Sequence, residues 1–95
     1  MTWTVRFHPA VFERDLPAIP ANLRIRIINA IETRLGVAPD RLGKPLRVGL
    51  AGFRRLRVGD WRVIYSVEGR VVMILIIGHR SEVYDSVALR LGPGS

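Results

Sequence analysis

The sequence predicts an α+β fold in which one small antiparallel β-sheet carries two N-terminal helices packed on one face. Two observations lead to this prediction. The first half of the chain holds an alternating strand pattern followed by helical periodicity, and the second half holds strand-like segments separated by glycine turns. The expected element order is therefore β-α-α-β-β-β. At 95 residues, the chain is expected to form a single domain over residues 1–95.

The N-terminal half contains the first strand and both helices. Residues 2–7 alternate between the two faces of a half-buried strand, and a short helix is expected over residues 9–16, closed by a proline. Apolar residues then recur at intervals of three and four, which predicts an amphipathic helix over residues 20–35. Gly36 is expected to form a left-handed C-terminal cap, and residues 40–45 are expected to be a loop.

The C-terminal half has β character. A first segment is expected after Leu46, interrupted by Gly49 and Gly52. Residues 71–77 are apolar on both faces, which suits a central strand covered on both sides. Residues 85–91 are expected to form a last helical turn.

A β-hairpin is the most specific local feature. Residues 53–58 and 61–67 flank Gly59-Asp60, and a glycine at the first loop position favours a type II′ turn. Counting outward from this loop gives the pairs Val58 with Trp61, Arg57 with Arg62, Leu56 with Val63, Arg55 with Ile64, and Arg54 with Tyr65. One face of the hairpin is then a core face formed by Leu56, Val58, Trp61, Val63 and Tyr65.

The opposite face of the hairpin carries Arg55, Arg57 and Arg62, with the last two directly across from each other. Like charges in this arrangement are destabilising, so the pair suggests a site for an anion. In the alternative interpretation these are exposed arginines that salt screens, or that pair with Glu82 or Asp85. The sequence leaves both interpretations open.

The charge balance also indicates a polyanionic partner. The chain has 15 basic and 8 acidic residues, for a net charge of +7. Every basic residue except Lys44 is arginine, a bias that either suits bidentate binding of phosphate or reflects a GC-rich genome.

The chain has no cysteine and two distant histidines, so neither a metal site nor a cofactor is expected. No membrane segment or signal peptide is visible, which predicts a cytoplasmic protein.

Three segments in order resemble one known family over essentially the whole chain. They are Gly43-Lys44-Pro45-Leu46, the stretch from Leu50 to Tyr65 that contains Leu-Arg-Val-Gly-Asp-Trp-Arg-Val-Ile-Tyr, and Gly78-His79-Arg80-Ser81-Glu82-Val83-Tyr84. This pattern is similar to that of the RelE/ParE superfamily of toxins from bacterial type II toxin–antitoxin modules. The resemblance implies helices packed on a small antiparallel sheet, and a cognate antitoxin that wraps the basic surface in a hetero-oligomer.

The resemblance implies two alternative activities. RelE-like members enter the ribosomal A site and cleave messenger RNA, whereas ParE-like members inhibit DNA gyrase and need no nuclease residues. The nuclease residues of the RelE-like pattern correspond here to Arg55, Arg57, Arg62, Arg80 with the adjacent His79, and Tyr84. A generic RNA-binding module is a third alternative, but the sequence has neither the aromatic pair nor the GXXG loop of such modules.

The proton-transfer groups are the open point of the nuclease hypothesis. Some members have lysines at the positions that Arg55 and Arg57 occupy in this chain. An arginine cannot act as a general base at neutral pH. The arginines suit charge stabilisation, Tyr84 suits base stacking, and His79 or Glu82 is left as acid or base. In the alternative interpretation, His79 caps or packs a strand end and Tyr84 closes the core.

Overall fold

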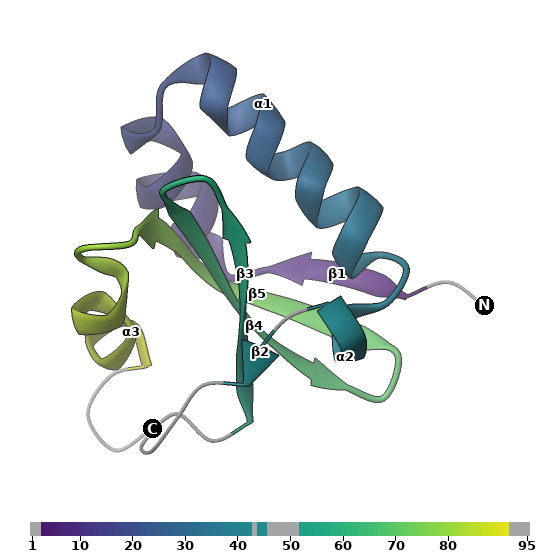
Figure 1. Ribbon diagram of the computed structural model, residues 1–95. Helices are drawn as coiled ribbons and strands as arrows, with labels where there is room; N and C mark the ends of the chain where they lie inside the picture. The colour runs from purple at the N-terminus through teal and green to yellow at the C-terminus, as the bar shows by residue number, and fades with distance from the viewer. Residues whose placement is uncertain (1–2, 43, 46–51, 92–95) are drawn as a thin grey trace.

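A five-stranded sheet with the strand order β1-β5-β4-β3-β2 forms the centre of the protein (Figure 1). The computed structural model describes residues 3–42, 44–45 and 52–91. The first half contains β1 (Thr4–Phe7), η1 (Val11–Asp15), η2 (Leu16–Ala18), α1 (Ala21–Ala30), η3 (Ile31–Leu35), α2 (Pro39–Leu42) and β2 (Lys44–Pro45). The second half contains β3 (Phe53–Val58), β4 (Trp61–Glu68), β5 (Val71–His79) and α3 (Val83–Leu91). The α+β prediction is confirmed.

The two N-terminal helices lie close to their predicted positions. η1 and η2 form the short helix, which runs two residues beyond its predicted end, because Pro17 occupies the first turn of η2, where a missing N–H costs nothing. α1 and η3 form the long helix, which ends at Leu35 as predicted.

Two predictions at the end of the long helix are wrong. Gly36 has φ −73° and is right-handed, so it is not a left-handed cap. Glycine is required at this position because the backbone of Glu32 lies close to it: a Cβ on residue 36 would lie 2.5 Å from the backbone oxygen of Glu32. The expected loop over residues 40–45 contains α2 and β2, and α2 begins at Pro39, a favoured first helical residue.

The hairpin of β3 and β4 has the predicted register in full, including Arg57 opposite Arg62 and Val58 opposite Trp61. Gly59 has φ +59°, and no described residue other than glycine has a positive φ, which fits the type II′ turn. The predicted segment after Leu46 lies outside the described residues, apart from Gly52, which sits in the turn before β3.

β5 is the central strand that the sequence predicted, and it has a neighbour on each side. It pairs antiparallel with β4 and parallel with β1, a direction that the element order left open. The sheet is thus mixed, with one parallel edge strand.

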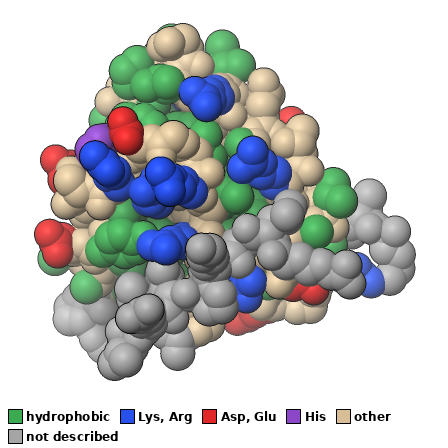
Figure 2. All heavy atoms as spheres, in the orientation of Figure 1, with side chains coloured by type: hydrophobic (Ala, Val, Ile, Leu, Met, Phe, Trp, Pro, Cys, Tyr) green, Lys and Arg blue, Asp and Glu red, His purple; other side chains and the backbone are tan. Residues whose placement is uncertain are grey.

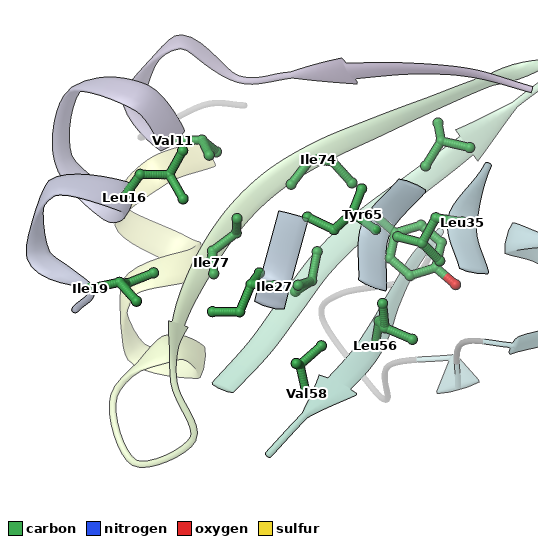
Figure 3. Packing of buried hydrophobic residues seen from close by; sticks show 13 residues of the cluster. Val11, Leu16, Ile19, Ile27, Leu35, Leu56, Val58, Tyr65, Ile74 and Ile77 are labelled. Carbon is green, nitrogen blue, oxygen red and sulfur yellow. The ribbon is translucent and has the colours of Figure 1, made fainter. Parts of the chain in front are cut away.

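Apolar clusters cover both faces of the sheet. The larger cluster joins the long helix and η1 to one face, and Figure 3 shows Ile27 and Leu35 packed over Leu56, Tyr65 and nearby strand residues. The smaller cluster joins α3 to the other face through Val83 and Val87, which pack with Ile64, Leu75 and Ile76. In the part of the chain that is described, no helix is long and apolar enough to span a membrane.

Candidate anion-binding site

Three arginines form a strip on the face of the sheet that α3 covers. This arginine strip consists of Arg55, Arg57 and Arg62, and the last two are direct cross-strand partners. Arg57 is exposed, and the other two are half-buried. Basic side chains gather on the face of the molecule that Figure 2 shows, next to a histidine and an acidic side chain. The register therefore concentrates positive charge at one end of the sheet.

α3 places Tyr84 beside the arginine strip. Val83 and Val87 are buried one helical turn apart and fix the helix on the sheet, which leaves Tyr84 on the flank that faces β3. The Tyr84 hydroxyl accepts a hydrogen bond from Arg55 Nη1 at 3.0 Å. Gly78 allows this close packing, since a Cβ at that position would lie 3.1 Å from two side-chain atoms of Val83.

Arg62 and Arg80 are held at the tip of the hairpin. Arg62 Nη1 donates to the backbone oxygens of Gly59 and Trp61, at 2.9 and 3.0 Å. The backbone N–H of Arg80 donates to Asp60 O at 2.8 Å, and Arg80 Nε lies 3.6 Å from Asp60 Oδ1. This ion pair is exposed, with 61% and 69% of the two side chains accessible, so a phosphate can compete for the arginine.

No acidic side chain among the described residues pairs with the arginine strip. Arg55 and Arg62 donate only to neutral oxygens, and Arg57 has no hydrogen-bond or ion-pair partner in the described residues. Neither Glu82 nor Asp85 forms the ion pair that the alternative interpretation expected. A guanidinium has five N–H donors, so most donors of the strip remain available to an anion.

His79 lies away from the arginine strip. It is the cross-strand partner of Trp61 and packs edge-on against that ring on the face that α1 covers, with 5.6 Å between ring centroids. Its Nδ1 accepts from the backbone N–H of Ser81 at 3.3 Å and lies 2.8 Å from the Ser81 hydroxyl. His79 thus contacts the turn between β5 and α3 through Ser81.

Most of the chain matches one known protein family. Residues 5–84 match the family described as the ParE toxin of the type II toxin–antitoxin system parDE. The chain belongs to this toxin family.

Two relatives from Mycobacterium tuberculosis carry RelE-type names, which places the toxin in the wider RelE/ParE superfamily. Toxin RelG is 36% identical over 86 residues, which cover 88% of this chain and 98% of the relative. Toxin RelE is 36% identical over 77 residues, which cover 79% of each chain. The crystal structure of the toxin–antitoxin complex RelBE2 from the same organism contains a chain with a TM-score of 0.77 and 34% identity, covering 84% of this toxin and all of that chain.

Sequence reasoning missed one prominent polar contact of this toxin. Asp15 of η1 and Arg90 of α3 form a bidentate ion pair, with N–O distances of 2.6 and 2.9 Å. Beside it lies a pocket of about 260 Å³ between η1 and α3, which His79 and Glu82 also line. The one sequence signal was Arg90 itself, a charged residue at the i+7 position of the buried stripe that Val83 begins.

Proposed function

We propose that this toxin is a RelE-like endoribonuclease that cleaves messenger RNA on the ribosome and thereby arrests translation in the cytoplasm. The observation that carries the proposal is the arginine strip (Arg55, Arg57, Arg62), with the Tyr84 hydroxyl bonded to Arg55 and no acidic partner among the described residues. A strip of this kind suits the phosphate backbone of RNA.

The proposed reaction is attack of the RNA 2′-hydroxyl on the adjacent phosphorus. The 2′-hydroxyl gives up its proton to a base, the bond from phosphorus to the 5′-oxygen of the next nucleotide breaks, and that oxygen takes up a proton. This leaves a 2′,3′-cyclic phosphate and a free 5′-hydroxyl. Negative charge builds up on the phosphoryl oxygens in the transition state, and guanidinium groups fixed beside them lower its energy. Arg57 and Arg62 take this role in the proposal, with Arg80 joining them once phosphate displaces Asp60.

Tyr84 is the group that we assign to proton transfer. His79 packs against Trp61, and both His79 and Glu82 line the pocket on the η1 side of α3, whereas Tyr84 points to Arg55 on the other flank. A neutral phenol can donate a proton and its phenolate can accept one, and tyrosine is among the established general acid–base groups. We therefore propose His79 as a residue that positions the turn carrying Arg80, and not as the acid or base.

Cleavage of a message on purified ribosomes tests the proposal. We expect cuts at ribosome-occupied codons with 2′,3′-cyclic phosphate ends, and a loss of at least about a hundredfold in Tyr84→Phe and Arg57→Gln. Arg6→Gln is the matched control, because Arg6 is an exposed arginine on β1, away from the hairpin. A folded wild-type protein that leaves ribosome-bound message intact would refute the nuclease proposal.

A second candidate function is ParE-like inhibition of DNA gyrase without cleavage. The observation that favours it is the placement of both non-tyrosine candidates for the base, His79 and Glu82, away from the arginine strip. A supercoiling assay with purified gyrase separates the two functions. Inhibition by wild type that persists in Tyr84→Phe would support the second candidate, and unchanged supercoiling would exclude it.

We also propose that a cognate antitoxin binds this toxin in a hetero-oligomer and covers the basic face. The similar RelBE2 structure is a toxin–antitoxin complex, and the net charge of +7 favours an acidic partner. Co-expression with the product of an adjacent short gene, followed by co-purification at low and high salt, tests this proposal. A salt-independent failure to co-purify would count against it.

A further inference from the structure

The Asp15–Arg90 ion pair joins two segments that are 75 residues apart in the chain. Arg90 Nη1 lies 2.6 Å from Asp15 Oδ2, and Arg90 Nη2 lies 2.9 Å from Asp15 Oδ1. Only 8% of the Asp15 side chain and 10% of the Arg90 side chain are exposed. A bidentate pair at this depth has little freedom to rotate, so it fixes the distance between η1 and α3.

The same two side chains also complete the edge of β5. β1 pairs with β5 from Val71 to Ile74, and no further pairing with β1 follows. Just beyond this point, Asp15 Oδ2 accepts from the backbone N–H of Ile77 at 2.9 Å, and Arg90 Nη1 donates to Leu75 O at 3.2 Å. The ion pair therefore takes the place of a neighbouring strand and satisfies backbone groups that would otherwise need other partners.

α3 needs this anchor because it has few others. It is nine residues long and too short to be stable alone. Its buried residues are Val83 and Val87, and Tyr84 and Leu91 are partly buried against the same apolar cluster. Val83 packs against Gly78 at the start of the helix, and Arg90 holds its last turn. Tyr84 lies between these two attachments, on the flank opposite Arg90, where its hydroxyl meets Arg55.

We infer that Asp15 and Arg90 are positioning residues for Tyr84. The pair fixes the rotation of α3 on the sheet, and this rotation sets where the Tyr84 hydroxyl lies relative to the arginine strip. The consequence for catalysis rests on the proposed nuclease function. The consequence for the position of Tyr84 does not, and it can be measured in the absence of RNA.

Fluorine NMR of the protein labelled with 3-fluorotyrosine provides the first test. The chain has two tyrosines, so the spectrum has one signal from Tyr84 and one from Tyr65, which is fully buried and reports on the core. In Asp15→Asn and Arg90→Lys, we expect the Tyr84 signal to shift toward that of a solvent-exposed tyrosine while the Tyr65 signal stays in place. We also expect α3 amides to exchange at least about tenfold faster.

Two control variants change exposed side chains on the same two elements. Glu13→Gln on η1 and Leu89→Gln on α3 change exposed side chains of the same elements and should leave both signals unchanged. An unchanged Tyr84 signal in both Asp15→Asn and Arg90→Lys would overturn the inference. Loss of the Tyr65 signal in both variants would overturn it as well, because the pair would then support the whole fold and not α3 in particular.

A double-mutant cycle provides the functional test. Asp15→Asn should lower kcat for ribosome-dependent cleavage by at least about tenfold, with a smaller change in KM. In the Tyr84→Phe background, the same substitution should change kcat less than about twofold, because the residue through which it acts is gone. Equal losses in both backgrounds would contradict a positioning role. Full activity of Tyr84→Phe itself would refute the catalytic role proposed for Tyr84. The NMR measurement would still test whether Asp15 and Arg90 position Tyr84.

Discussion

Arg57→Gln should make the protein more stable while it weakens the function. Arg57 and Arg62 are direct cross-strand partners, and no described acid neutralises either of them. If the two guanidinium charges lie as far apart as cross-strand Cβ atoms, about 5.5 Å, they repel by about 0.75 kcal/mol in bulk water. With a Debye length of about 8 Å at 0.15 M salt, roughly half of this repulsion remains. We therefore expect a gain of about 0.4 kcal/mol at 0.15 M salt, which rises to about 0.5 kcal/mol at lower salt.

Thermal unfolding measures this gain. For a domain of this size, about 0.5 kcal/mol corresponds to a rise in Tm of roughly 2–4 °C. The rise should disappear at 1 M salt, where the Debye length is about 3 Å. A short RNA oligonucleotide should raise the Tm of wild type more than that of Arg57→Gln, because at a given ligand concentration a tighter ligand stabilises the folded state more.

The control for this prediction is Arg6→Gln, which removes an exposed arginine from β1 and leaves the arginine strip intact. It lowers the net charge by the same amount, so any stability gain from net charge alone appears in both variants. Equal shifts in Tm for the two variants, or a shift for Arg57→Gln that persists at 1 M salt, would refute the argument that local repulsion in the strip is the cause.

Three further predictions follow from single contacts. Tyr65→Phe should destabilise by about 1–3 kcal/mol in urea unfolding, because the buried oxygen of Pro39 loses the hydroxyl that donates to it at 2.6 Å. Gly36→Ala should destabilise by about 1–2 kcal/mol despite the better helix propensity of alanine, since the new Cβ would lie 2.5 Å from a backbone oxygen; increased stability would contradict this reasoning. Asp60→Asn should raise the affinity for RNA about fivefold in fluorescence anisotropy at low salt, because it frees Arg80 from a competing carboxylate worth about 1 kcal/mol; unchanged affinity would count against a role for Arg80.

Local features of this chain were predictable where short-range geometry determines them. The register of the hairpin follows from one two-residue loop, so Gly59-Asp60 was sufficient to place Arg57 opposite Arg62. The end of the long helix was predicted at Leu35 from Gly36 and Pro39, and the helix ends there although Gly36 is not a left-handed cap. The candidate site was therefore predictable as far as it lies on β3 and β4.

Features that depend on distant parts of the chain were not predictable in this way. The parallel direction of β1 depends on which edge of β5 remains free once β4 has paired, and no local pattern in residues 4–7 encodes it. The Asp15–Arg90 pair joins residues from opposite ends of the chain. Gly36 was misjudged because glycine serves two needs, positive φ and close approach, and the sequence does not distinguish them.

In the proposed function, the two faces of the sheet have different roles. The face under α1 carries the larger apolar cluster, and His79 packs beside it on Trp61. The face under α3 carries a smaller cluster and the arginine strip, whose mutual repulsion reduces stability. A face selected only for stability would place an acid among these arginines. Asp60, in the hairpin loop, instead pairs weakly with Arg80 at the exposed hairpin tip, where an incoming phosphate can displace it. The positive charge of the strip thus remains available to an anionic partner, which is the condition that both RNA cleavage and antitoxin binding require.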